Sequence, residues 1–220
     1  MNRSHKLDGV ILKRFDLNEA DRVLTVFTRE EGKVSILAKG VKRVVSRKAG
    51  SVEAGNHSSL FVASGSNFYI LQEVQVKDSY QKMKSSLGTL KYGYYILELA
   101  DKILPEHEPH NDVYHLVLQI LYLLDSQPRK IYIRAFEVKL LAMLGYLSIT
   151  LKQLDDGSLS GHEFLNKDAG ELVYSLSRNS WEQISEMSPS EDAMSRVEQF
   201  LRFRLEKVLE RELRSVHLFD

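Results

Sequence analysis

Short apolar and β-branched runs separated by polar turns fill the first 80 positions of the chain. Five of these runs have the length and composition of β-strands. They are GVILKRF (9–15), RVLTVFT (22–28), KVSILAKG (33–40), SSLFVAS (58–64) and NFYILQEVQV (67–76). Closely spaced strands in so short a segment are typical of a small closed barrel, either an OB-fold or an SH3-like barrel. We therefore predict an N-terminal barrel domain over residues 1–80.

After residue 80 the apolar residues recur at helical spacing. One helix is expected over 87–104, ending at Pro105, with a buried stripe of Leu90, Tyr94, Leu97, Ala100 and Leu104. Further helices are expected over 113–124, over 131–144, and from Ser188–Pro189 to about residue 213. Residues 148–187 show no clear period. The prediction is an α+β protein whose second domain, residues 81–220, is mainly helical.

Composition narrows the class of protein. The 220 residues are 43% hydrophobic and 27% charged, as in ordinary globular proteins, and the formal net charge is zero. There is no cysteine, which excludes disulfides, thiolate catalysis and cysteine-bound metal. The most apolar run, 113–124, is shorter than the roughly 20 residues that span a membrane, and the N-terminus lacks a signal-peptide pattern. We expect a cytoplasmic protein without a membrane segment.

No catalytic motif is present. The sequence has no glycine-rich phosphate loop, no nucleophile elbow and no HExxH pattern. His107 and His110 have a spacing seen in metal sites, but they lie in a loop rich in Glu and Pro, where solvated side chains are the simpler expectation. We therefore predict that the protein is not an enzyme.

The distribution of charge is uneven. Residues 1–80 carry thirteen Lys and Arg against nine Asp and Glu, and no acidic residue occurs between Glu31 and Glu53. That interval contains Lys33, Lys39, Lys42, Arg43, Arg47 and Lys48. Cations without acidic neighbours in sequence favour a phosphate partner, since binding would release counterions. The alternative is an ordinary solvated loop between the third and fourth strands.

Aromatic residues near this basic stretch could stack on unpaired bases. Phe15 and Phe68 lie at strand ends and are the better candidates, whereas Phe27 and Phe61 are expected in the barrel core. The predicted DNA-binding residues are Arg14, Phe15, Lys33, Lys39, Lys42, Arg43, Arg47, Lys48 and Phe68. If the basic stretch is only a solvated loop, contact with DNA would have to lie around Arg14, Phe15 and the other strand ends.

Four blocks of sequence resemble the RecO family of bacterial recombination mediators. They are NEADRVLTVFTREEGKVSILAKGVKR (18–43), YYILELADKILPEHEPH (94–110), IRAFEVKLLAMLGY (133–146) and FLRFRLEKVLERELRSV (200–216). The first block is long and specific, and the other three are rich in leucine. The resemblance implies an N-terminal OB-fold followed by a helical domain, which agrees with the fold expected from the residue pattern.

The resemblance also implies a function and partners. Members of the family bind and anneal single- and double-stranded DNA without being enzymes. They act with RecR, contact the C-terminal tail of the single-stranded-DNA-binding protein SSB, and so help to load RecA on SSB-coated gaps. That tail is acidic and ends in an aromatic residue, and family members bind it through the helical domain. In this chain the candidate cations are Arg134 and Lys139, with the alternative that both lie at the helix surface in water.

The chain departs from the family at a zinc site. Many members carry two CxxC pairs after the LGY helix, whereas this chain has Gln153, Asp156, Tyr174 and Ser177 at the aligned positions. These residues do not form a zinc site. We expect no cofactor, and hairpins in this region that are held by packing, through Leu154, Phe164, Leu172 and Trp181.

Two other functions stay open from the residues alone. A barrel with a basic loop does not by itself specify DNA, so an RNA-binding OB-fold adaptor of another pathway is one alternative. A structural scaffold whose basic stretch is ordinary surface is the other. The scaffold would show no salt-sensitive affinity for oligonucleotides, and the adaptor would prefer RNA and would not accelerate DNA annealing.

Overall fold

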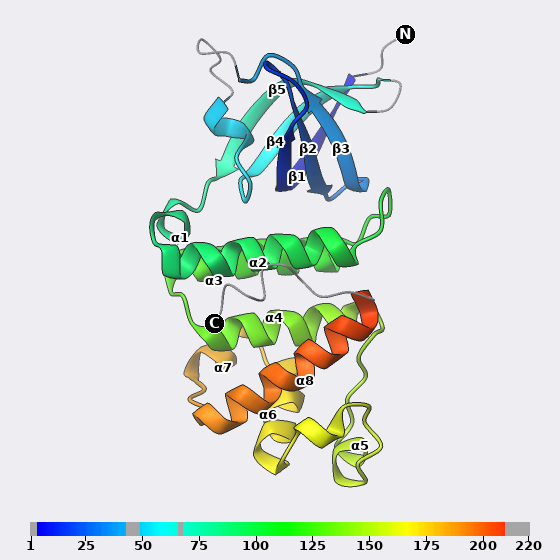
Figure 1. The fold of residues 1–220 in the computed structure, drawn as a ribbon, viewed down its shortest axis with the longest axis vertical. Coiled ribbons are helices and arrows are strands. Elements are labelled where there is room, and N and C mark those ends of the chain that lie inside the picture. The colour runs from blue at the N-terminus through cyan, green and yellow to red at the C-terminus, as the bar shows by residue number, and fades with distance from the viewer. Residues whose placement is uncertain (1–3, 43–48, 66–67, 210–220) are drawn as a thin grey trace. The chain divides into compact units, whose positions relative to one another are not determined.

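Five strands close into a barrel in this computed structural model, which describes residues 4–42, 49–65 and 68–209 (Figure 1). They are β1 Ser4–Asp16, β2 Arg22–Thr28, β3 Gly32–Ala38, β4 His57–Ala63 and β5 Tyr69–Asp78. The order around the barrel is β1-β2-β3-β5-β4, and β4 pairs with β1 to close it. Among the strand pairs of the described residues, only β3–β5 is parallel. The predicted five-stranded barrel is confirmed.

The barrel interior is filled by alternate residues along each strand, as the period of two requires. Leu7 and Ile11 of β1 lie beside Leu24 and Val26 of β2, and all four are fully buried. The same core contains Val34, Ile36, Ala38, Val41, Val52, Leu60, Val62 and Leu71. Val52 enters from a short 3₁₀ helix, η1 (Ala49–Val52), in the connection between β3 and β4.

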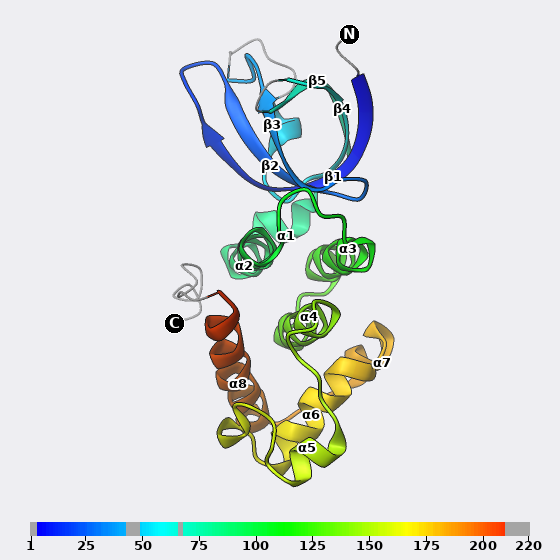
Figure 2. The same cartoon turned by 90° about the vertical axis from the view of Figure 1, so that its right-hand side faces the viewer.

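Three helices pack on the barrel and form one compact unit with it, within residues 1–126. They are α1 Gln81–Ser85, α2 Leu87–Ile103 and α3 Asn111–Ser126, and Figure 2 shows α2 and α3 end-on beneath the barrel. The ring of Phe27 contacts that of Tyr114 at 5.8 Å between centroids. At Gly32, where φ is +69°, a side chain would lie 2.1 Å from the backbone oxygen of Glu108, so only glycine fits this approach.

The compact units of the structure do not have the same limits as the domains expected from the sequence. The change from strands to helices falls between Asp78 and Gln81, close to the expected boundary at residue 80. However, the compact units divide after Ser126, because α2 and α3 bury residues on the outer wall of the barrel. Leu12 and Phe27, on β1 and β2, are among these residues and are almost completely buried.

The second compact unit, within residues 127–214, is helical. Its helices are α4 Lys130–Met143, α5 Leu151–Asp155, α6 Lys167–Arg178, α7 Trp181–Glu186 and α8 Glu191–Leu209, with a 3₁₀ helix η2 His162–Phe164. The contacts among α4, α6 and α8 form its core, where Phe136, Val173 and Phe200 are fully buried.

Two details of the second unit differ from the expectation. The last helix begins at Glu191 rather than at Ser188–Pro189, because the Ser190 hydroxyl accepts a hydrogen bond from the Ala193 amide at 3.2 Å and caps it. Residues 148–187 form short helices instead of hairpins. Within the described ranges, no helix has the length and apolar character needed to cross a bilayer.

Candidate nucleic-acid interface

Cations gather where β1 ends and β2 begins. Arg14 near the end of β1, Arg22 at the start of β2 and Lys42 after β3 all lie here. The Lys42 ammonium donates to the backbone oxygen of Asn18 at 3.0 Å, in the loop between β1 and β2. In that loop the Asn18 carboxamide oxygen accepts from the amides of Ala20 and Asp21, which fixes the turn.

The segment after β3 is held against the same loop. The Asp21 carboxylate accepts a hydrogen bond from the Gly40 amide at 2.7 Å, and the Lys42 amide donates to the backbone oxygen of Ala20 at 3.0 Å. The beginning of the basic stretch therefore has a defined position next to the ends of β1 and β2. The positions of Arg43, Arg47 and Lys48 lie outside the described residues.

These cations have acidic partners in space that are distant in sequence. The Asp16 carboxylate contacts Lys42 at 2.9 Å and Arg22 at 2.8 Å. The Glu53 carboxylate contacts Arg14 at 2.7 Å. Hydrogen bonds from Lys42 and Arg22 lower the pKa of Asp16. The expectation that the basic stretch lacks an internal partner is therefore wrong for Lys42, because the barrel brings Asp16 next to it.

Lys33 is placed differently from the expectation. Its side chain is only 11% exposed, and its ammonium donates to the backbone oxygen of Asp101 at 2.5 Å near the end of α2. Burial lowers the pKa of Lys33. A cation at a helix C-terminus stabilises the last carbonyls. Lys33 therefore ties β3 to α2 and does not present a charge to solvent, whereas Lys39 is exposed.

The four aromatic residues considered for base stacking differ in how far they are exposed. Phe27 is fully buried as expected, and Phe15 at the end of β1 is 48% exposed, so its ring is available for stacking. Phe61 was expected in the core but is 42% exposed on the outer side of β4, opposite Lys6 of β1. Phe68 is half-buried.

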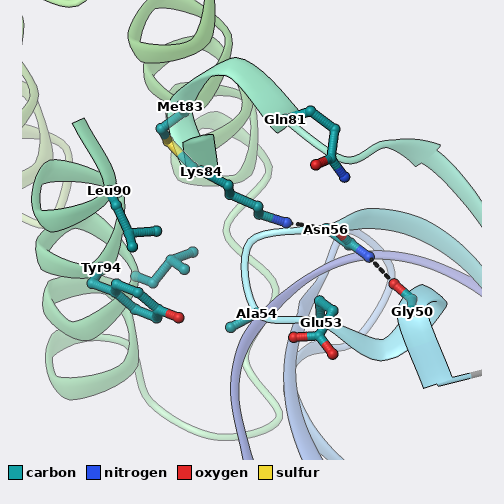
Figure 3. Close-up of a pocket in the computed structure, with 11 residues that line it drawn as sticks. Gly50, Glu53, Ala54, Asn56, Gln81, Met83, Lys84, Leu90 and Tyr94 are labelled. Carbon is teal, nitrogen blue, oxygen red and sulfur yellow. Dashed lines mark hydrogen bonds between the residues drawn. The ribbon is translucent and has the colours of Figure 1, made fainter. Parts of the chain in front are cut away.

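A pocket lies between α2 and the segment that leads from η1 to β4 (Figure 3). A second pocket adjoins it and is also lined by residues of β1. Their volumes are about 290 and 330 Å³, and Tyr94 and Ala54 line both. Tyr94 was expected in the buried stripe of its helix, but its side chain is 50% exposed. The helical spacing of apolar residues predicted burial wrongly for Tyr94, because α2 at this position faces the pocket and not the barrel core.

The two cations proposed for an SSB tail lie on α4. Arg134 is 7% exposed, and its guanidinium donates to both carboxylate oxygens of Glu137 at 3.1 and 2.9 Å and lies 3.4 Å from Glu198. Its charge is therefore compensated inside the unit, and the alternative in which it stays in water is wrong. Lys139 is half-buried, donates to the backbone oxygen of Asn179 at 2.8 Å, and has a pKa lowered by burial.

The four positions that align with zinc ligands have local roles in helices. Gln153 forms a reciprocal capping box with Thr150 at the start of α5. The Asp156 carboxylate accepts from the Ser158 amide at 3.0 Å, and the Ser177 hydroxyl donates to the backbone oxygen of Tyr174 at 2.6 Å. Across the described ranges, no three His, Cys, Asp or Glu side chains are grouped as metal ligands would be.

We expect purified protein to contain no stoichiometric zinc, because an amide, a phenol and a hydroxyl do not replace thiolates as zinc ligands. Elemental analysis should give well below one zinc per chain, and a chelator should leave the unfolding temperature unchanged. About one zinc per chain, together with loss of stability on chelation, would contradict this prediction.

Two protein-family models match the chain. Recombination protein O N terminal matches residues 1–80, and Recombination protein O C terminal matches residues 84–149. The first match covers the barrel, and the second covers α2, α3 and α4.

Several curated proteins named DNA repair protein RecO are similar to the chain. The protein from Pelotomaculum thermopropionicum is 30% identical over 173 residues, which are 78% of this chain and 68% of that protein. The protein from Symbiobacterium thermophilum is 33% identical over 64% of this chain and 57% of its own length. The protein from Anaeromyxobacter sp. strain K is 34% identical over 76% of this chain and 66% of its own length. The chain thus spans between half and about two thirds of these relatives, and it belongs to the RecO family of DNA repair and recombination proteins.

Proposed function

We propose that this protein is a recombination mediator that binds single- and double-stranded DNA and anneals complementary strands. The observation that carries the proposal is the group of cations at the ends of β1, β2 and β3, together with the exposed ring of Phe15 at the end of β1. Cations that neutralise phosphates reduce the repulsion between two strands, and weak base readout leaves the bases free to pair. This activity requires no catalytic group.

The partners follow from family membership and belong to the same proposal. With RecR, the protein would help to load RecA on gaps coated with SSB. The SSB tail would bind the helical unit, with Lys139 as the candidate cation beside the ring of Trp181, 5.8 Å from its ammonium. Arg134 has no part in this proposal, because its guanidinium lies against the carboxylates of Glu137 and Glu198.

The decisive experiment is an annealing assay with complementary DNA strands coated with SSB, with and without RecR. The proposal predicts faster annealing than in the protein-free reaction, and RecR-dependent loading of RecA. Binding that prefers RNA, without faster DNA annealing, would indicate an RNA-binding adaptor instead. An absence of salt-sensitive affinity for any oligonucleotide would indicate a scaffold.

Neutralising Asp16 should strengthen DNA binding. The Asp16 carboxylate contacts Lys42 and Arg22, and therefore competes with a phosphate for both cations. Asp16→Asn removes this competition, and because exposed ion pairs are weak, the affinity should rise only about 1.4- to 5-fold. The measurement is a fluorescence-anisotropy titration with a single-stranded oligonucleotide at low salt.

A matched control separates this effect from a general gain in positive charge. Glu73→Gln removes one exposed carboxylate from β5 of the same barrel and should change affinity less than Asp16→Asn. Equal gains in the two variants would show that Asp16 does not compete with phosphate at this place.

A further inference from the structure

The adjoining pockets beside Tyr94 are bounded by two different kinds of wall. On one side lie Leu90 and Tyr94 of α2, and on the other lie Glu53 and Ala54 of the segment that enters β4 (Figure 3). Leu97 of α2 also lines this pocket. The half-exposed side chain of Tyr94 lines both pockets, so it offers surface to each.

The walls are held in place by hydrogen bonds and close packing. The Lys84 ammonium donates to the side-chain oxygen of Asn56 at 2.6 Å, and the side-chain nitrogen of Asn56 donates to the backbone oxygens of Gly50 and Ser51. Asn56 itself is 2% exposed. The segment 50–56 is therefore fixed to α1, and the pocket is present before any ligand arrives, as in most binding sites.

Close packing between α1 and α2 also fixes the position of the pocket wall. At Gly93, an added Cβ would lie 2.7 Å from the sulfur of Met83, so α1 approaches α2 where a side chain would not fit. This contact keeps Leu90 and Tyr94, on the same helix, at the pocket wall.

Two cations line the second pocket next to the tyrosine. They are Lys13 and Arg14, consecutive residues of β1, and they contact Asp101 at 2.6 Å and Glu53 at 2.7 Å, respectively. The Lys13 side chain is 55% exposed and that of Arg14 is 31% exposed, so a phosphate could compete for both. Asp101 and Glu98 also line this pocket, and Glu98 contacts Lys102 at 2.5 Å.

A ligand for this place must therefore combine a flat apolar face, polar edges and a neighbouring negative charge. We propose that the pockets beside Tyr94 receive one unstacked nucleotide of a bound DNA strand, with its base on the Tyr94 ring and its phosphate at Lys13 and Arg14. Glu53 lies across the pocket as a hydrogen-bond acceptor for amino groups on the base edge. This site rests on the proposed DNA binding and extends it from the loops of the barrel to helix α2.

The test is the variant Tyr94→Ala in the full-length chain. Its affinity for a single-stranded oligonucleotide of roughly 16 nucleotides should fall about 5- to 150-fold, the effect of losing one stacked base. Its affinity for an abasic chain of the same length should equal that of the unaltered protein, because no base is present to stack. Tyr94→Phe should bind both chains like the unaltered protein, since the ring remains.

Tyr122→Ala is the matched control. Tyr122 is a more exposed tyrosine, at 65%, on α3 of the same unit, and its loss should leave both affinities unchanged. Unchanged affinity of Tyr94→Ala for the oligonucleotide would overturn the inference while leaving DNA binding intact. An equal loss on the abasic chain would also overturn it, because the tyrosine would then act on the phosphates or the fold. If the unaltered protein binds neither chain, the proposed function fails and the inference fails with it.

Discussion

Reversing Arg43, Arg47 and Lys48 to Glu is expected to remove most of the salt-dependent affinity for single-stranded DNA. Each phosphate contact contributes roughly 0.7 to the slope of log affinity against log salt concentration, so three lost contacts lower that slope by about 2 units. Lys42 is left unchanged because it contacts Asp16, and a Glu there would place two carboxylates together. DNA annealing should be lost with binding, since both depend on neutralised phosphates.

The measurement is a set of binding titrations over a range of salt concentrations, with circular dichroism to establish that the variant is folded. A control with the same change in net charge is available in the second unit, where Lys152, Lys167 and Arg178 are exposed. Reversing those three to Glu should change the slope much less. A folded Arg43/Arg47/Lys48 variant that keeps its slope would show that the basic stretch is ordinary surface.

The largest expected effect on stability belongs to Arg134. Its guanidinium faces the carboxylate of Glu137, a residue that is fully buried. Arg134→Ala removes this cation from a buried carboxylate, which typically lowers the free energy of unfolding by about 3–5 kcal/mol. Trp181, the single tryptophan, lies in α7 against the ring of Tyr132, so its fluorescence during urea unfolding reports on this unit.

Two further variants test the cause of the loss. Replacing both Arg134 and Glu137 by Met should restore most of the stability, because no buried charge then remains without compensation. Arg196→Ala breaks an exposed pair with Asp192, 2.9 Å apart on α8, and should cost less than about 1 kcal/mol. If Arg134→Ala costs no more than Arg196→Ala, the buried pair does not stabilise the unit.

This result also bears on the SSB tail. A charge reversal at Arg134 would place three carboxylates together around α4, so any loss of peptide binding could arise from unfolding. Lys139 is the better position for a test, because its side chain is partly exposed and makes its hydrogen bond to a backbone oxygen rather than to a carboxylate.

The local pattern of apolar residues was sufficient for the main elements. The short β-branched runs of β2 and β3 and the helical period after residue 87 predicted these elements to within a few residues. These signals are local, because a strand or helix with one buried face repeats apolar residues at its own period. In residues 148–187, α5 and α7 contain too few turns to show a period, and α6, which has 12 residues, was missed between them, so helices were mistaken for hairpins.

The sequence by itself determined the barrel, the helical region and the family, since each depends on residues close together along the chain. The tertiary structure decided which charged side chains are available to bind a phosphate. Lys33 is buried against α2, Arg14 meets Glu53, and Lys42 meets Asp16 across 26 positions of sequence. Tertiary packing also exposed Tyr94 and Phe61 and buried Arg134. Electrostatic energy and burial depend on distances in space. The number of residues between two positions in the sequence does not determine how far apart they lie after folding.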